Sequence, residues 1–299
     1  MFTRRQWLVS AFSLVGGRAL PVALAHGDST KPSLDFEKRL VDLEKASGGR
    51  LGVAFLNTGT NAMAGHRAEE RFSLCSTFKL LAVGAVFARV DRGKEKLDRT
   101  IVFTKADIVT YSPVTEKLVG TPGMSVKELC AAAMMFSDNT AGNLLLGIIG
   151  GTQGMNDFAR TIGDDKTRLD RIEPDLNEAL PDDPRDTTTP SAMLSNLHAL
   201  VVGNALSGAS KAQLTEWLVQ CKTGDKRLRS GLPTAWKVGD KTGAGERGTT
   251  NDVAVAWPPG QPPILVSVYL TGATGTSDDR NAVIAAVGKE IPAALGLPA

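Results

Sequence analysis

Short apolar runs bounded by turn-forming residues occur near both ends of the chain and have the pattern of buried β-strands. Residues 51–56 form one such run, and Asn57-Thr58-Gly59-Thr60 after it favours a hairpin. Two more runs, 253–257 and 264–270, flank Pro258-Pro259-Gly260. Because buried strands need partners for their backbone groups, these segments must pair with one another. The pattern therefore predicts a sheet domain that is discontinuous in the sequence.

Helical periodicity dominates the rest of the chain. Apolar residues recur at helical spacing in the stretches 34–45, 80–90, 126–135, 140–149 and 282–295. Pro190 fits the first turn of a further helix that runs on to Val202. We therefore expect residues 26–75 and 219–299 to form the sheet domain and residues 76–218 to form an all-helical domain.

Residues 1–25 differ from the globular part. An Arg-Arg pair precedes an apolar stretch that ends in Ala23-Leu24-Ala25, the shape of a cleavable export signal. A membrane anchor is the alternative, but Arg18 and Pro21 interrupt the stretch, which is short for a bilayer span. We expect cleavage after Ala25 and delivery to the periplasm, and the paired arginines indicate the twin-arginine route.

Charge and composition exclude several function classes. The chain has 34 basic and 32 acidic residues, and loss of residues 1–25 would remove three arginines and no acid, leaving 31 against 32. So even a balance argues against a nucleic-acid or membrane partner for the mature protein. The three histidines, His26, His66 and His198, show no metal-ligand spacing, so we expect neither a zinc site nor a Ser-His-Asp triad. No metal and no cofactor are predicted.

Three sparse motifs occur in an order that is typical of one serine acyl-transfer site. Ser76-Thr77-Phe78-Lys79 is followed 61 residues later by Ser137-Asp138-Asn139, and a Lys-Thr-Gly comes after both. A serine hydroxyl needs an adjacent base, and Lys79 lies one helical turn beyond Ser76 on the same face. Taken alone, Ser76 reads as a helix N-cap and Ser137-Asp138-Asn139 as a cap or turn. The combination of motifs overturns both interpretations.

Lys-Thr-Gly occurs twice, so its assignment depends on context. Lys222-Thr223-Gly224 follows an apolar-periodic run over 214–221, where Gly224 reads as a helix C-cap glycine. Lys241-Thr242-Gly243 precedes a glycine-rich turn and the strand at 253–257, which predicts a position on or beside the edge of a sheet. We take Lys241 as the active-site lysine.

With these residues, the chain resembles the class A β-lactamases over nearly all of its length after residue 25. The segment Arg171-Ile172-Glu173-Pro174-Asp175-Leu176-Asn177 is similar to the omega-loop signature of that family. The resemblance implies that this loop spans 171–186, that Arg171 pairs with Asp186 and that the Glu173-Pro174 bond is cis. It also implies an α+β fold with an antiparallel sheet flanked by helices, an all-helical domain and the site in the cleft between them.

The resemblance implies a role for each site residue. Ser76 would be the nucleophile, Glu173 with Asn177 would hold the hydrolytic water, and Ser137 would relay a proton to the departing ring nitrogen. Whether Glu173 or Lys79 is the acylation base stays open. The remaining residues would bind substrate: Asn139 the side-chain amide, Lys241 and Thr242 the carboxylate, the N–H groups of Ser76 and Ala244 the oxyanion, and Tyr111 the ligand at the cleft mouth.

The carboxylate pocket of class A members usually contains an arginine. The position nine residues after Lys241, where many members have it, is Thr250 here. Arg227 matches an alternative placement, although without the resemblance it reads as a solvated surface cation. We expect Arg227→Ala to affect substrates but not folding. The family's disulfide pairings would require partners at Gly245 and Val83, so we expect Cys75, Cys130 and Cys221 to be free thiols.

The function implied is the hydrolysis of penicillins and cephalosporins by an exported, monomeric enzyme that confers β-lactam resistance. A D-alanyl-D-alanine peptidase of the penicillin-binding type shares the three motifs but lacks the Glu173 loop. A non-catalytic β-lactam sensor would acylate and stop, and it would be expected to carry a membrane anchor and no deacylating glutamate. An amidase such as a glutaminase stays open, because a fold does not fix a substrate.

Overall fold

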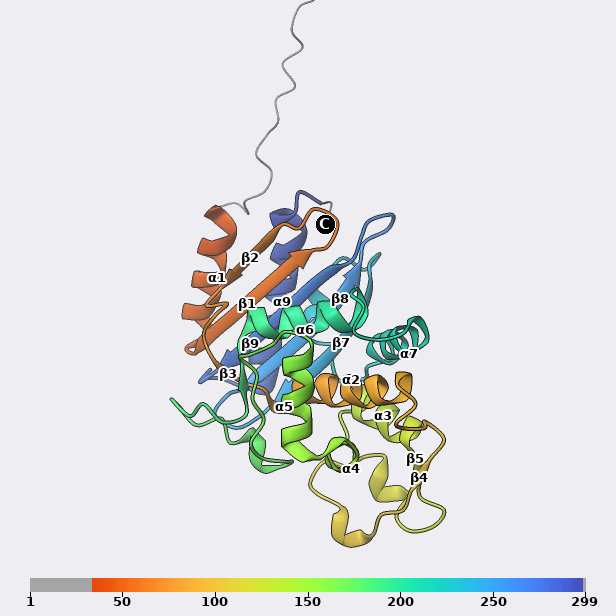
Figure 1. The fold of residues 1–299 in the computed structure, drawn as a ribbon. Coiled ribbons are helices and arrows are strands. Elements are labelled where there is room, and N and C mark those ends of the chain that lie inside the picture. Colours follow the sequence, from red (N-terminus) through yellow and green to blue (C-terminus); the bar gives the residue numbers. More distant parts are fainter. Residues whose placement is uncertain (1–33, 298–299) are drawn as a thin grey trace, which may run out of the picture.

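A computed structural model describes residues 34–297 (Figure 1). The predicted export signal over residues 1–25 and its cleavage after Ala25 lie outside these described residues. Within 34–297, no helix is both long and apolar enough to cross a membrane.

The centre of the fold is an antiparallel five-stranded sheet with the order β2-β1-β9-β8-β7. Its strands, in chain order, are β1 (Arg50–Asn57), β2 (Met63–His66), β7 (Lys237–Ala244), β8 (Thr250–Trp257) and β9 (Ile264–Thr271). The hairpin predicted after residue 56 joins β1 to β2, and β1 pairs with β9 through Val53 and Val268. Strands from the two ends of the chain therefore lie side by side, as the sequence predicted (Figure 1).

Alternate residues of the central strands face two different hydrophobic cores. On β8, Val253 and Val255 belong to the core shared with the middle helices, whereas Ala254 and Ala256 belong to the core under α1 and α9. Successive side chains of a strand point to opposite faces, so a sheet covered on both faces needs apolar residues at every position. This explains why the strands appear in the sequence as continuous apolar runs.

Helices cover both faces of the sheet. The helices in chain order are α1 (Leu34–Ser47), α2 (Phe78–Asp91), α3 (Val126–Met135), α4 (Asn139–Ile149), α5 (Gly151–Thr161), α6 (Pro190–Val201), α7 (Gly208–Val219), α8 (Leu228–Gly231) and α9 (Ser277–Ala294). Helices α1, α8 and α9 lie on one face, and on the other α6 packs on β1 and β9 while α7 packs on β7 (Figure 1). The helices predicted at 34–45, 80–90, 126–135 and 140–149 are confirmed, and α9 begins five residues earlier than expected.

Short elements connect these layers. Two small antiparallel ladders pair β3 (Phe72–Ser73) with β6 (Thr187–Thr188) and β4 (Thr100–Ile101) with β5 (Met124–Ser125). Single 3-10 turns occupy Cys75–Thr77, Lys105–Asp107, Thr115–Lys117 and Asp175–Asn177. The β3–β6 ladder is important for the site, because it joins the residues just before Ser76 to the end of the omega loop. Helix α6, from the middle of the chain, packs directly on the sheet. The predicted division into a sheet domain and a helical domain, at 75/76 and 218/219, stays a prediction.

The interpretation of Gly224 as a helix cap is wrong. Helix α7 ends at Val219, and Gly224 lies five residues beyond it with no left-handed φ. A glycine is needed here because Asp240 on β7 packs against its Cα: a Cβ at position 224 would lie 1.4 Å from Asp240 Oδ2. The first Lys-Thr-Gly is therefore packed against the strand that contains the second.

All three cysteines are free and buried. Burial raises the pKa of the thiols of Cys75 and Cys130 far above the ordinary value, and it also raises that of Cys221. A thiol reacts as its thiolate, so these side chains are protected both sterically and electrostatically.

We predict that an aromatic disulfide reagent at pH 8 will find no fast-reacting thiol in the native mature protein and three after denaturation without reductant. The physical reason is that the folded protein suppresses both access and ionisation. A native thiol that reacts at the rate of a free cysteine would contradict the burial described here, and fewer than three thiols after denaturation would indicate a disulfide.

Candidate active site

Ser76 lies in the 3-10 turn Cys75–Thr77, immediately before α2. The sheet fixes this turn from behind: Asn251 Nδ2 donates to the carbonyls of Ser73 and Leu74 at 2.9 and 3.2 Å. Thr77 Oγ1 contacts the Tyr269 hydroxyl at 3.0 Å. The N-cap of α2 is Thr77, not Ser76, and no side chain accepts a capping hydrogen bond there. The Ser76 hydroxyl is consequently not used as a cap.

Lys79 is fully buried one helical turn after Ser76. Its Nζ lies 2.8 Å from Ser76 Oγ, 2.7 Å from Asn139 Oδ1 and 2.9 Å from the Ser137 carbonyl oxygen. It also forms an ion pair with Glu173 Oε1 at 2.9 Å. Burial lowers the pKa of Lys79, and the Glu173 carboxylate opposes that shift. A single amine therefore joins the serine turn, the Ser137-Asp138-Asn139 motif and the omega loop.

Helix α4 leaves space for this amine. A Cβ at Gly142 would lie 2.8 Å from Lys79 Cε, so a larger residue on that face of α4 would displace the lysine. The close approach explains why a glycine is used inside a helix, where it is otherwise unfavourable.

Ser137-Asp138-Asn139 combines a helix cap with two site residues. The Asp138 carboxylate caps α4 by accepting from the Ala141 N–H at 2.9 Å, and it also accepts from the N–H groups of Val114 and Thr115. The interpretation as a cap is thus correct for Asp138. Ser137, with a left-handed φ of 58°, and Asn139 flank the cap and face Lys79.

Glu173 is buried, with 1% of its surface exposed, and is not a surface charge. Its Oε1 accepts from Ser76 Oγ at 3.2 Å, and its Oε2 accepts from Asn177 Nδ2 at 2.5 Å. Asn143 on α4 holds the main chain of Glu173 from both sides, because its amide contacts both the N–H and the carbonyl of that residue at 2.9 Å. The Glu173-Pro174 peptide bond is cis, as the resemblance implied.

The predicted pair between Arg171 and Asp186 closes the base of the loop. Arg171 Nε donates to Asp186 Oδ2 at 2.6 Å, and the N–H groups of Asp170 and Arg171 donate to Oδ1. Asp186 is 1% exposed, so this carboxylate is fully committed to holding the two ends of the loop together.

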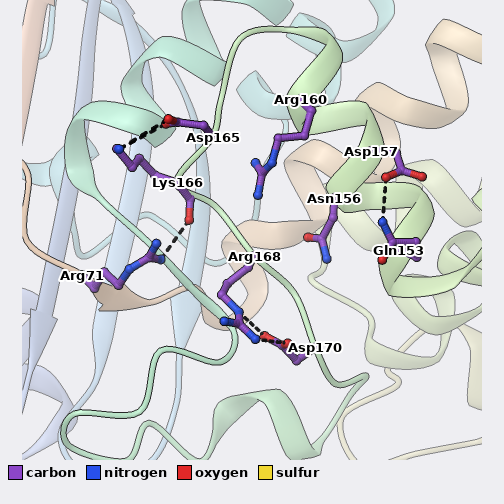
Figure 2. Close-up of a pocket in the computed structure, with 9 residues that line it drawn as sticks. All are labelled: Arg71, Gln153, Asn156, Asp157, Arg160, Asp165, Lys166, Arg168 and Asp170. Atoms are coloured by element: carbon purple, nitrogen blue, oxygen red, sulfur yellow. Dashed lines mark hydrogen bonds and ion pairs between the residues drawn. The ribbon is translucent and has the colours of Figure 1, made fainter.

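A charged hollow of about 460 Å³ lies on the segment that leads into the loop (Figure 2). Within it, Arg71 donates to the Lys166 carbonyl at 2.8 Å and Arg168 pairs with Asp170. Arg160 donates to the carbonyls of Asp164 and Thr167. These cations hold the chain over 164–170, and none of the predicted site residues lines the hollow.

Lys241 and Thr242 lie on β7, the edge strand of the sheet, as predicted. Lys241 Nζ donates to Ser137 Oγ at 2.9 Å and to the Thr242 carbonyl at 2.7 Å. Burial, together with the positive charge of Lys79, lowers the pKa of Lys241 to about 7. Ser137 therefore lies between the two lysines.

Arg227 is not a solvated surface cation, since only 8% of it is exposed. Its Nη1 donates to the carbonyls of Gly243 at 2.8 Å and Asn251 at 2.7 Å, and its Nε donates to Asn281 Oδ1 at 2.9 Å. The side chain thus joins β7, β8 and α9 directly behind the Lys-Thr-Gly strand. These contacts favour a role for Arg227 in stability as well as in substrate binding, and its effect on substrates stays a prediction.

Tyr111 and Ala244 occupy more open positions. Tyr111 is 55% exposed with a left-handed φ of 63°, and its carbonyl accepts from the Asn139 N–H at 3.0 Å. Ala244 ends β7 and is exposed. The preceding Gly243 packs against the serine turn, because a Cβ there would lie 3.1 Å from the Leu74 carbonyl oxygen.

Two asparagines and one threonine of the site were not predicted from the sequence. Asn143 follows Asn139 by four residues, so the helical spacing of polar residues in an otherwise apolar α4 was a usable signal. Asn251, inside a buried strand, gave no signal of its contact with the serine turn. Thr223 was obscured by the interpretation of its motif as a cap, although its Oγ1 lies 2.5 Å from Thr242 Oγ1.

No group of three or more His, Cys, Asp or Glu side chains between residues 34 and 297 is arranged to hold a metal ion. The chemistry available is that of a buried serine hydroxyl between an amine and a carboxylate, with further polar groups around it. That arrangement is typical of a serine hydrolase that works through an acyl-enzyme.

Comparison with known proteins defines the family. The family model described as "Beta-lactamase enzyme family" matches residues 35–295. Curated relatives include Beta-lactamase OXY-2 of Klebsiella oxytoca, 46% identical over 91% of this chain and 93% of that protein, and Beta-lactamase CTX-M-25 of Escherichia coli, 48% identical over 85% and 87%. The chain belongs to the beta-lactamase enzyme family, within class A.

Solved structures agree with this assignment. An ancestral class A beta-lactamase is 59% identical with a TM-score of 0.85, covering 87% of this chain and 99% of that one. A putative class A beta-lactamase, PenP from Rhodopseudomonas palustris, is 56% identical with a TM-score of 0.86 over the same shares. The predicted α+β fold class is thereby confirmed.

We predict that Arg227→Ala will lower both activity and stability. Loss of the charge-assisted contact to substrate that the resemblance implies should reduce kcat/KM about ten- to hundred-fold. Loss of the buried guanidinium, which leaves two strand carbonyls and Asn281 short of a donor, should lower the free energy of unfolding by roughly 2 to 4 kcal/mol. Urea denaturation and steady-state kinetics measure the two effects separately.

Lys226→Ala is the matched control, because the neighbouring Lys226 is exposed and pairs only with the exposed Asp278. It should leave both quantities nearly unchanged. Unaltered stability of Arg227→Ala alongside reduced kcat/KM would return Arg227 to a role in substrate binding alone.

Proposed function

We propose that this protein hydrolyses the β-lactam amide of penicillins and cephalosporins through an ester on Ser76, and so confers resistance to these antibiotics. The observation that carries the proposal is the placement of Ser76 Oγ between Lys79 Nζ at 2.8 Å and Glu173 Oε1 at 3.2 Å inside a buried site. In this arrangement Glu173 can act as the base for the Ser76 hydroxyl during acylation, and again for a water molecule during deacylation.

In the acylation step, Ser76 Oγ bonds to the lactam carbonyl carbon and the ring C–N bond breaks. Lys79 donates to Oγ, so the hydroxyl proton is directed at Glu173, which favours Glu173 as its acceptor. The developing oxyanion would be held by the N–H groups of Ser76 and Ala244. The ring nitrogen would take its proton from Ser137, whose Oγ already accepts from Lys241. The proton taken up by Glu173 would then pass by way of Lys79 to Ser137, which restores the Ser137 hydroxyl and leaves Glu173 ionised for the next step.

Substrate would be held at both ends of the cleft. The ammonium of Lys241, the hydroxyl of Thr242 and the nearby Arg227 would attract the carboxylate that penicillins and cephalosporins carry. Asn139 would bind the side-chain amide, and the exposed ring of Tyr111 offers a stacking surface at the mouth. Arg227 acts here mainly by holding β7, given its contacts to the strand carbonyls.

Deacylation would use Glu173 a second time. With Asn177 it would orient a water molecule toward the ester carbonyl, take one proton from it and return a proton to Ser76 as the ester C–O bond breaks. A buried glutamate in this position distinguishes the proposal from a peptidase or sensor that acylates and stops. We further propose that the protein is exported to the periplasm, with cleavage after Ala25, and acts as a monomer.

We predict that Glu173→Ala will acylate in a stoichiometric burst with a penicillin and then turn over about 10² to 10⁴ times more slowly than the parent. Acylation can still proceed, because Lys79 contacts Ser76 Oγ and can act as its base. Deacylation is slow, because no positioned base remains for the hydrolytic water. Intact-mass spectrometry followed by peptide mapping should find one persistent adduct, on the Ser76 peptide.

Asp175→Ala removes an exposed carboxylate two residues away in the same loop and serves as the matched control, with parent turnover expected. Ser76→Ala should abolish the adduct. Parent-rate turnover by Glu173→Ala, or an adduct on another residue, would refute the mechanism.

We predict that kcat/KM for a carboxylate-bearing β-lactam will fall as pH rises through about 7. The reason is that the pKa of Lys241 is lowered to about 7, so the ammonium is lost in the free enzyme above that pH. Lys241→Arg keeps a cation to higher pH and should move this descending limb upward. Identical profiles for the two proteins would show that another group controls the limb.

A further inference from the structure

The segment Lys222-Thr223-Gly224, for which no catalytic role was predicted, contacts both the Ser137 side of the site and strand β7. The Lys222 N–H donates to the Met135 carbonyl at 2.8 Å, at the end of α3 and two residues before Ser137. Gly224 packs against Asp240 on β7 with no room for a side chain. Between these two anchors lies Thr223, whose position is therefore set by the backbone on either side of it.

The Thr223 hydroxyl lies between two other groups. Its Oγ1 is 2.5 Å from Thr242 Oγ1 and 3.3 Å from Cys221 Sγ. Thr242 is 3% exposed, while Thr223 is partly exposed. The three side chains thus form a short hydrogen-bonded row that leads from the interior to the residue proposed to bind the substrate carboxylate.

The direction of the hydrogen bonds in this row follows from what each group can donate. A threonine hydroxyl has one proton to donate and two lone pairs to accept with. If Thr242 donates to a carboxylate, it must accept from Thr223, and Thr223 then has no proton left for Cys221. The buried thiol stays protonated, since burial raises its pKa, so it can donate to Thr223. A row oriented in one direction also strengthens its last hydrogen bond.

We propose that Thr223 is a positioning residue for the β-lactam carboxylate: by donating to Thr242 Oγ1, it commits the Thr242 proton to the ligand. Without that donor, the Thr242 hydroxyl is free to rotate and to donate elsewhere. The inference rests on the proposed function, because it concerns the substrate carboxylate of that same site.

The test compares variants of Thr223 on a matched pair of substrates, benzylpenicillin and its methyl ester, in which the carboxylate is neutral. Thr223→Val keeps the shape but cannot hydrogen bond. It should lower kcat/KM for benzylpenicillin about tenfold, mainly through KM, and change kcat/KM for the ester less than about twofold. Thr223→Ser keeps the hydroxyl and should restore most of the loss.

Cys221→Ala and Cys221→Ser probe the other end of the row in the same assay. The alanine variant should show a smaller loss on benzylpenicillin than Thr223→Val, and the serine variant, which keeps a donor, should show less still. Thermal unfolding of each protein checks folding, and Thr223→Ala replaces Thr223→Val if the valine variant does not fold.

The outcomes separate the two proposals. A parent protein that hydrolyses neither substrate would overturn the proposed function, and this inference with it. An active parent with unchanged Thr223→Val, an equal loss on both substrates, or a Thr223→Ser variant as poor as Thr223→Val would overturn the role of Thr223 and leave the proposed function standing.

Discussion

The site is organised around one buried ammonium, that of Lys79. An isolated charge in a protein interior is costly, so it is retained only where acceptors surround it. Here the acceptors come from three segments of the chain: Ser76, the Ser137 carbonyl with Asn139, and Glu173. The same contacts that satisfy the charge bring the nucleophile and the carboxylate together. Chemistry and stability therefore depend on the same group of contacts, and neither can be changed without affecting the other.

The edge strand β7 supplies the opposite wall of the site. An edge strand has unpaired backbone groups on one side, which makes it suited to bind a ligand. The cost is that this edge needs support from behind, and Arg227, Asp240 and the segment around Thr223 provide it. Arg227 and Thr223 lie more than ten residues before Lys241 in the sequence, and Asp240 is its neighbour on β7, yet all three contacts fall on the same short stretch of strand.

The sequence predicted most elements because their apolar periodicity is strong, as in α3 and in β8 and β9. The context of the second Lys-Thr-Gly predicted the edge position of Lys241, and the resemblance to the class A β-lactamases implied the pair of Arg171 and Asp186. Prediction from the sequence failed where a residue's reason lies in tertiary contact: Gly224 carries the signature of a helix cap but is a glycine because Asp240 presses on it. Burial of Arg227 was likewise hidden, since an arginine does not indicate its partners, whereas the helical spacing of Asn143 from Asn139 indicated its side of α4 but not its contact with Glu173. Local patterns reveal periodicity and motif chemistry, whereas spatial neighbours far along the chain leave no such trace.

The pairing of β1 with β9 has a consequence for how the protein is made. The serine turn near residue 76 is held by Asn251 and Tyr269, which leave the ribosome almost two hundred residues later. Until then, β1 has no partner on its β9 side, and the nucleophile has no fixed geometry. Contacts of such large sequence separation slow folding and leave strand edges open in the meantime. Ser76 can therefore reach its active geometry only after the last fifth of the polypeptide has been made. A prematurely terminated chain contains the nucleophile but lacks the strands that fix its turn.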